Sequence, residues 1–323
     1  MLKKLRPYGR LVNWVLGACY DFYRFAQFGG WKTDLSSQEQ RNFYAAKVYH
    51  SLEKSMSFLD NNPNSGWANA NLLIDVIECA IVSNNIGNHD LHAYDVLRKF
   101  IDLNYERSNN SLAEVVKNRF STLKVPLDID LDNGVIHLTS KDIQKGKIAN
   151  PYDFFYTRYS VREFSEERLR KDTIHDAIKL ALKTPSACNR QPWHVYHLDD
   201  PTSIEKALSL QTGNRGFSHT IQDLLIICAD LRAFNPGSER YQHWIDGGMF
   251  AMSIVYSLHS LGAGSCCLNW SHQGKTDKKL RKVIPSISNS HTIIMMLAVG
   301  NIRSKNQLCV SPRRSLDEII TEI

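Results

Sequence analysis

Apolar residues recur at helical spacing through most of the first 125 residues, where they favour a series of amphipathic helices. Large apolar side chains predict a helix over residues 11–28, which ends at Gly29 and Gly30 because glycine favours the position after a helix end. Further helices are expected from Ser36 or Ser37 to about residue 59, from about residue 69, and near residues 90–106 and 110–121. The helix that starts near residue 69 is expected to expose Asp75 and Glu78 and to bury one face, made of Leu72, Leu73, Val76, Ile77 and Ile81.

A polar stretch from Val125 to about Asn150 interrupts the helical pattern. Within it, residues 135–138 are compatible with a short strand. Because a run of this composition favours a linker, we predict a helical region over residues 1–148 and a second domain over residues 149–323. The polar residues of the stretch are Asp128, Asp130, Asp132, Asn133, Gly134, Lys141, Lys145, Gly146 and Lys147.

Short apolar runs of strand length characterise the second half of the chain. Residues 224–229 and 293–299 are continuous apolar runs and are expected to be strands buried on both faces, while residues 194–198 alternate as a strand. A further turn and strand is expected over residues 262–270. Helices are expected near residues 169–182, over residues 204–210, and from Asp246 onward. This order predicts an α+β fold with a central antiparallel or mixed sheet wrapped by helices.

Two clusters of polar residues flank the expected helix at residues 169–182. The first cluster contains Arg158, Ser160 and Arg162, whose two guanidinium groups and hydroxyl suit a phosphate monoester. The second is the run Pro-Ser-Ala-Cys-Asn-Arg-Gln-Pro-Trp at residues 185–193, which can hydrogen-bond the rim of a heterocycle. Taken alone, Ser160 and Glu163 also fit a helix capping box with ordinary surface arginines nearby.

Together the two clusters resemble the opening of the FMN-binding site of the nitroreductase family, Arg-x-Ser-x-Arg-x-Phe followed by Pro-Ser-x-x-Asn-x-Gln-Pro-Trp. The resemblance covers about residues 151–323 and implies a nitroreductase-like fold that binds FMN in two sites across a homodimer interface. The cofactor-binding residues that it implies are Arg158, Ser160, Arg162, Pro185, Ser186, Asn189, Asn214, Arg215, Asn269, Trp270 and Arg313.

The same resemblance implies a role for each group of residues. The first cluster and Arg313 would hold the FMN phosphate, and the second cluster would reach the flavin from the partner subunit. Asn214 and Arg215 would lie near the pyrimidine edge, and Asn269 and Trp270 beside flavin N5. Two positions depart from the family pattern: Trp270 stands where glycine is common, and Ser311 replaces the usual lysine before Arg313.

No side chain needs to be a catalytic nucleophile in this scheme, because the flavin performs the chemistry and the protein binds and orients it. The implied activity is that of an FMN-dependent oxidoreductase, with ping-pong hydride transfer from NAD(P)H through flavin N5 to a small acceptor. An alternative is a non-catalytic or structural partner that retains the fold within a polysaccharide-assembly system. A yellow protein that bleaches with NAD(P)H would separate the two.

Two motifs in the helical first half have a resemblance of their own. The stretch Tyr-Asp-x-x-Arg-Phe at residues 20–25 and the stretch His-x-Leu-Glu-Lys at residues 50–54 resemble the amino-terminal extension of one nitroreductase-like subgroup. That subgroup is associated with bacterial surface-polysaccharide synthesis. Ser55 stands where the subgroup usually has glycine. We expect His50, Glu53 and Lys54 to lie near the substrate entrance.

Charge narrows the range of partners only locally. The net charge of +6 is modest, and the sequence has no stretch of alternating basic and aromatic residues of the kind that binds nucleic acid. Lys3, Lys4, Arg6 and Arg10 cluster at the start and could meet a membrane surface beside the apolar 11–28 helix. We favour instead the packing of that helix against the other helices and the flavin domain.

The seven cysteines are odd in number and lack a Cys-x-x-Cys motif, which favours a reduced, cytoplasmic protein. Residues 16–19 resemble a lipoprotein cleavage site, but the apolar region before them is short and interrupted by Asn13. His89, Asp90 and His92 have ingredients of a metal site, but the sequence offers no second cluster to complete it, so no metal is expected.

Overall fold

The structure is a computed structural model that describes residues 2–125, 131, 133–272 and 274–323, with side chains from residue 9 onward. The first part is helical, as predicted. It contains α1 (Leu2–Phe28), α2 (Gln38–Met56), α3 (Trp67–Val82), α4 (Asn88–Asn104), the 3₁₀ turn η1 (Tyr105–Arg107) and α5 (Leu112–Thr122). None of the described helices has both the length and the apolar character needed to cross a membrane.

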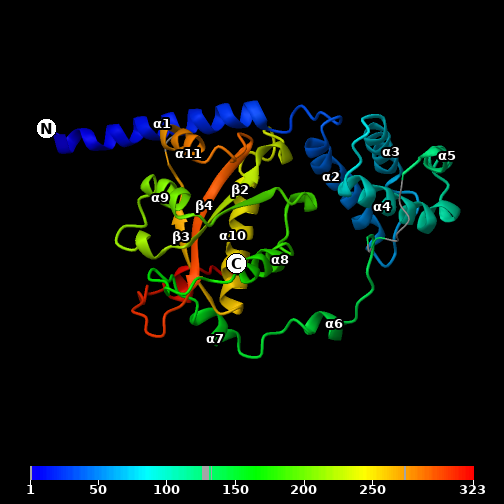
Figure 1. The fold of residues 1–323 in the computed structure, drawn as a ribbon. Coiled ribbons are helices and arrows are strands. Elements are labelled where there is room, and N and C mark those ends of the chain that lie inside the picture. The colour runs from blue at the N-terminus through cyan, green and yellow to red at the C-terminus, as the bar shows by residue number, and fades with distance from the viewer. Residues whose placement is uncertain (1, 126–130, 132, 273) are drawn as a thin grey trace.

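Helices α2 to α5 pack around one core and form a bundle at the right of Figure 1. Trp67 and Phe100 are fully buried at its centre, with their rings in edge contact at a centroid distance of 5.0 Å. The predicted buried face of α3 is correct for Leu73, Val76 and Ile77, but Leu72 points toward solvent. A shift of one residue turns a side chain by more than a quarter of a helical turn, so periodicity places the edge of a buried stripe poorly.

Helix α1 lies apart from this bundle and runs along the sheet domain (Figure 1). Near its end, Phe25 packs with Leu231, Ala233 and Phe234, and Phe28 lies against the same cluster. The large apolar residues before Phe25 are exposed, so the expectation that the whole apolar face of this helix packs within the chain is wrong. The helix touches the domain along one side, and none of the described elements lies beside its other side.

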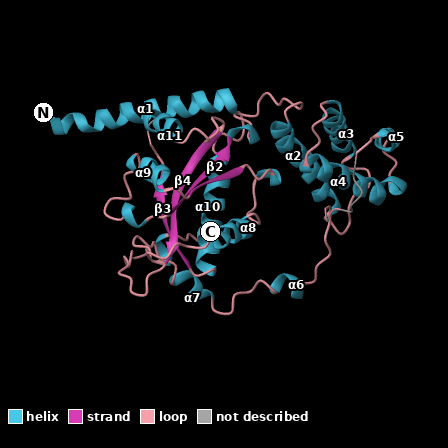
Figure 2. Ribbon diagram, in the orientation of Figure 1, coloured by secondary structure: helices cyan, strands magenta, loops and turns pink. Residues whose placement is uncertain are grey.

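A long exposed connection carries the chain from the bundle back to the sheet domain (Figure 2). It includes the short helices α6 (Ser140–Gln144) and α7 (Pro151–Tyr156). Residues 135–138 do not form the predicted strand, because no strand in the described part of the chain pairs with them. The aspartates Asp128, Asp130 and Asp132 of the predicted linker lie outside the described residues.

The sheet has four antiparallel strands in the order β1-β2-β4-β3. Alternate residues of β2 point to opposite faces: Leu225 and Ile227 meet α8 and α10, whereas Leu224 and Ile226 pack with α9 and α11. The predicted α+β fold, with an antiparallel sheet covered by helices, is therefore confirmed. The elements are β1 (Trp193–Leu198), β2 (Asp223–Asp230), β3 (Ala263–Asn269), β4 (His291–Asn301), α8 (Lys171–Ala181), α9 (Pro201–Ser209), α10 (Gln242–Ser260) and α11 (Gly274–Val283).

Two helix starts differ from the prediction. No helix begins at Ser160, which forms an isolated parallel bridge with Ser265, and α8 starts only at Lys171. Glu163 pairs with Arg303 and does not close a capping box. Helix α10 begins at Gln242, one turn before the expected Asp246.

Candidate active site

The segment from Arg158 to Phe164 runs beside the edge strand β3. The amide of Val161 donates to the Ser265 carbonyl at 2.9 Å, and the Val161 and Phe164 side chains are buried in the core. These anchors fix the backbone while Arg162 remains exposed and Arg158 and Ser160 remain half-buried. The buried Val161 thus holds its neighbours Ser160 and Arg162 at the surface of the sheet edge.

The arginines of this cluster carry charge that no carboxylate balances. Among the described residues, neither Arg158 nor Arg162 forms an ion pair, and both charges act on the same buried thiol. Burial raises the pKa of Cys266, and the positive charges of Arg162 and Arg158 oppose that rise. Two cations held near one strand without an acidic partner form a set of donors that fits a phosphate dianion.

The carboxy-terminal segment passes the same place. Arg162 Nη1 contacts Cys309 Sγ at 3.5 Å, four residues before Arg313. The Arg313 guanidinium donates to the Ser311 carbonyl and is otherwise exposed, again without a carboxylate partner among the described residues. The structure thus brings the segment that carries Arg313 to Arg162, while Ser311 adopts a left-handed φ of 50° in the turn between them.

The loop after α9 joins this face to the end of β3. Gln211 Nε2 donates to the Asn269 carbonyl at 2.9 Å, and Thr220 Oγ1 donates to the Arg162 carbonyl at 3.3 Å. Asn214 is buried, and its amide donates to the Leu208 carbonyl at 2.9 Å, so it stabilises the loop. Arg215 is exposed, and with Asn214 and Gln211 it lines a pocket of about 920 Å³.

Asn269 and Trp270 point to opposite faces, because neighbouring residues of an extended chain alternate. Asn269 is exposed, whereas Trp270 is only 4% exposed and its indole donates to Asp277 at 3.1 Å inside the core. The Trp270 ring therefore lies inside the core, on the face opposite to the Asn269 side chain. The sequence carried the signal for this, since Cys266, Leu268 and Trp270 share one apolar face.

The second cluster has an unusual backbone. Cys188, Asn189 and Gln191 all have positive φ, between 50° and 53°, around the 3₁₀ turn η2 (Ala187–Asn189). The Ser186 hydroxyl accepts the Gln191 amide at 2.9 Å, and the buried Asp246 carboxylate accepts the Ala187 amide at 3.1 Å. Side-chain acceptors thus hold a run of left-handed residues that costs conformational energy.

A single chain does not bring the two clusters together. Trp193 opens β1 and pairs with Ala229, which pairs with Thr292 at the start of β4. Ser160 lies at the other edge of the sheet, beside Ser265, which pairs with Val299 near the end of β4. Pro185, Ser186 and Asn189 therefore lie at the corner of the sheet diagonally opposite Arg158, Ser160 and Arg162.

The helical bundle docks beside the second cluster. Helix α2 lies against η2 and η4 (Leu231–Ala233), and Glu39 of α2 pairs with Arg232. Between α2 and the sheet is a polar pocket of about 410 Å³, lined in part by Asn42, His194 and Tyr196. The Asn42 Oδ1 atom is buried without a hydrogen-bond partner among the described atoms.

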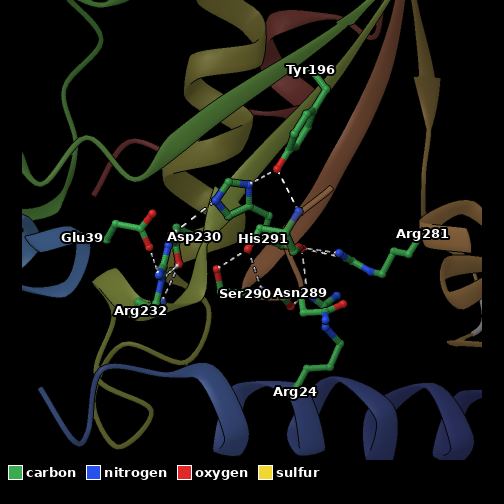
Figure 3. Close-up of polar contacts among 10 residues, drawn as sticks. Arg24, Glu39, Tyr196, Asp230, Arg232, Arg281, Asn289, Ser290 and His291 are labelled. Carbon is green, nitrogen blue, oxygen red and sulfur yellow. Dashed lines mark hydrogen bonds and ion pairs between the residues drawn. The ribbon is translucent and has the colours of Figure 1, made fainter. Parts of the chain in front are cut away.

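The sequence reasoning missed the polar network beside this pocket, which Figure 3 shows. His291 Nδ1 lies 2.8 Å from the Tyr196 hydroxyl, and His291 Nε2 lies 3.3 Å from Asp230 Oδ2. Despite burial, hydrogen bonds from His291 and Arg232 hold the pKa of Asp230 well below its usual value. Tyr196, Asp230 and His291 come from three different strands, so only tertiary structure brings them together.

The amino-terminal motifs now have structural partners. Tyr20 Oη donates to Asp277 at 2.6 Å, and Arg24 donates to the His291 carbonyl at 2.7 Å, so the motif at residues 20–25 docks α1. His50 Nδ1 lies 3.3 Å from the Glu53 carboxylate of the same helix. His89 Nδ1 lies 3.0 Å from the Tyr49 hydroxyl, and His92 Nδ1 lies 2.9 Å from Asn133 Oδ1.

Comparison with known proteins finds a family match within the sheet region. Residues 156–301 match the model of the nitroreductase family, which confirms the resemblance for this stretch. A protein of Archaeoglobus fulgidus named NADH dehydrogenase/NAD(P)H nitroreductase is 26% identical over 148 residues, which cover 45% of this chain and 81% of the relative.

Solved structures with similarity to the chain include two nitroreductases. An NADH dehydrogenase/NAD(P)H nitroreductase of Parabacteroides distasonis has 16% identity and a TM-score of 0.46, with 53% of this chain and 95% of that chain covered. A nitroreductase of Desulfovibrio desulfuricans in complex with FMN has 19% identity and a TM-score of 0.45, with 55% and 98% covered.

Proposed function

We propose that this protein is an FMN-dependent oxidoreductase that takes hydride from NAD(P)H and passes it to a small acceptor. The observation that carries the proposal is the group of arginines at the β3 edge that have no carboxylate partner among the described residues, in a stretch that matches the nitroreductase family. The relatives with NAD(P)H or FMN in their names support the same cofactors.

In this proposal Arg158, Ser160, Arg162 and Arg313 hold the terminal phosphate. The charges of Arg158 and Arg162 both act on Cys266, and Cys309, four residues before Arg313, contacts Arg162, so these groups lie on one side of β3 before the anion binds. Arg215 lies toward the pyrimidine edge and stabilises negative charge on it, while the buried Asn214 keeps the loop in place. Asn269 presents its exposed side chain beside the reactive edge, and Trp270 contributes only its backbone.

Bound FMN would supply the hydride chemistry, in two half-reactions that use the same site in turn. The protein therefore needs no nucleophilic side chain. It has to bind the phosphate, orient the ring and leave one face open to NAD(P)H and then to the acceptor. Its acceptor is proposed to be a small or nucleotide-sugar-like molecule, in line with the polysaccharide-associated subgroup that residues 20–25 and 50–54 resemble.

We further propose a homodimer in which Pro185, Ser186 and Asn189 of one protomer complete the site of its partner. The diagonal separation of the two clusters in one chain supports this arrangement. Exposed apolar side chains on α10, including Ile245 and Met249, provide a surface that a partner would bury. The seven cysteines are all unpaired within the chain, which suits a reducing cytoplasm.

The test is flavin content and its reduction. The purified protein should be yellow, release FMN in preference to FAD, and bleach when NAD(P)H is added without oxygen. The double variant Arg158→Ala/Arg162→Ala should bind FMN at least about 100-fold more weakly, because two charge-assisted contacts are lost. A double variant with a full complement of FMN would show that the phosphate lies elsewhere, and a yellow protein that does not bleach would favour the non-catalytic alternative.

A further inference from the structure

Side chains on one side of helix α1 fix it to the sheet domain. Tyr20 bonds to Asp277, Arg24 donates to the carbonyls of His291 and Asn289 at 2.7 and 2.9 Å, and the buried Phe25 packs against Phe234. Arg24 is itself buried, and Figure 3 shows it reaching from the helix toward the start of β4. The rotation of α1 about its own axis is therefore set by specific contacts.

The rows on the other side of α1 are apolar and uncovered. Residues four and eleven apart fall in nearly the same row of a helix. The exposed fraction of these side chains ranges from 44% for Val15 to 75% for Phe22. One row holds Leu11, Val15 and Phe22, and the next holds Val12, Leu16 and Tyr23. An apolar strip of this size on a helix that is already docked indicates a further surface that covers it.

Charge identifies the surface. The first 20 residues contain four basic residues, Lys3, Lys4, Arg6 and Arg10, and no acidic residue. In Figure 1 the amino-terminal half of α1 extends beyond the sheet domain, so this charged end reaches away from the rest of the chain. Trp14 is also exposed, and tryptophan and tyrosine favour the boundary between lipid headgroups and acyl chains.

We propose that α1 lies in the surface of an anionic lipid bilayer, with the rows of Leu11 and Leu16 inserted and the Tyr20–Arg24 row still bound to the sheet domain. The helix is not apolar enough to span the bilayer, so it lies along the surface. A second copy of α1 is a poorer occupant, because its first 20 residues contain no acidic residue to pair with the four basic residues. This assignment does not depend on the proposed oxidoreductase activity.

The experiment uses the full-length protein and sedimentation with vesicles. Phosphatidylcholine vesicles that contain phosphatidylglycerol should carry the protein down, pure phosphatidylcholine vesicles should carry little, and high salt should release it. The triple variant Leu11→Ser/Leu16→Ser/Phe22→Ser should bind at least about tenfold more weakly, because it removes three apolar side chains from the inserted strip. Its melting temperature and flavin content should match those of the wild type, since these residues do not touch the sheet domain.

A matched control distinguishes binding through this strip from nonspecific adsorption through other exposed apolar residues. Leu59 and Val82 are the most exposed large apolar residues of the bundle side, and the variant Leu59→Ser/Val82→Ser should bind vesicles as the wild type does. Absence of vesicle binding, equal binding to both vesicle types, or an equal loss in the control would overturn the proposal. So would a triple variant that keeps its vesicle binding, or one whose main effect is to change the oligomeric state, which would assign α1 to a second copy.

Discussion

Arg41 in the helical bundle and Arg158 at the sheet edge are the same residue type in opposite environments. Arg41 is fully buried, and its guanidinium donates to both oxygens of Asp90 at 2.9 Å and to the carbonyls of Leu35 and Asn85 at 2.8 Å. Arg158 and its neighbour Arg162 have no carboxylate partner among the described residues. A charge satisfied inside the chain serves the fold, whereas a charge left without a partner at a prepared surface is available to a ligand.

The sharpest way to break this comparison is to remove Arg41. Arg41→Ala should lower the free energy of unfolding by about 3–5 kcal/mol, because it leaves the Asp90 carboxylate buried and uncompensated. Urea denaturation followed by circular dichroism measures the change. Arg119→Ala is the control: Arg119 pairs with Asp75 and Glu78 at the surface, so its loss should cost only about 1 kcal/mol. Equal losses in the two variants would contradict the distinction between buried and surface pairs.

The double variant Arg158→Ala/Arg162→Ala should lose flavin binding and keep its stability, the reverse of what is expected for Arg41→Ala. Without flavin, its free energy of unfolding should stay within about 0.5 kcal/mol per substitution of the wild-type value, since no ion pair within the chain is broken. Thermal melts should separate the two proteins only when FMN is added, because a ligand stabilises the folded state in proportion to its affinity. A large loss in the flavin-free protein would make these arginines structural residues like Arg41.

The sequence predicted those features that depend on local periodicity. Helices α2 to α5 and all four strands lie where the apolar pattern placed them, within a few residues, because burial of one face fixes the period. The pattern could not show that residues 135–138 lack a pairing strand, or that Ser160 pairs with β3 and starts no helix. Both outcomes depend on segments distant in sequence.

The candidate site was predictable only as a set of motifs. The two clusters were recognisable, but their placement at opposite corners of the sheet follows from strand order, which periodicity does not encode. The Asp230–His291–Tyr196 network joins residues of three strands, β2, β4 and β1, that no local pattern connects. For α1, the sequence showed a broad apolar face, whereas the partners Asp277 and His291 decide which row is bound.

A buried histidine at the contact between α1 and the sheet domain should make stability depend on pH, an effect smaller than that of Arg41→Ala. His243 is buried beside Phe25 and Phe234, and burial lowers its pKa from 6.5 to about 4. Between pH 6.5 and 4 the unfolded chain takes up a proton that the folded protein does not, so the free energy of unfolding falls as the pH falls. Within this range the contribution of His243 to the slope of the free energy of unfolding against pH should approach about 1.4 kcal/mol per pH unit.

The variant His243→Leu should remove that part of the pH dependence, and denaturation midpoints measured across the pH range compare its slope with the wild type. His219→Gln is the control, because His219 is exposed and should leave the slope as it is. An unchanged slope in His243→Leu would mean that His243 takes up its proton equally well in the folded state.

The smallest effect is expected at the ion pair between the bundle and the sheet domain. Glu39 is largely exposed, and its partner Arg232 is already held by the buried Asp230, with a closest contact of 2.6 Å. Glu39→Gln should therefore lower the free energy of unfolding by less than about 1 kcal/mol and leave flavin affinity unchanged. Asp230→Asn is the matched comparison and should cost several times more, because it removes the buried negative charge between Arg232 and His291 and leaves one acceptor oxygen in place of two. If Glu39→Gln instead proved as damaging as Asp230→Asn, an exposed pair would be positioning the bundle against residues 187–189. The distinction drawn from Arg41 and Arg119, that buried ion pairs contribute more to stability than surface pairs, would then fail at this interface.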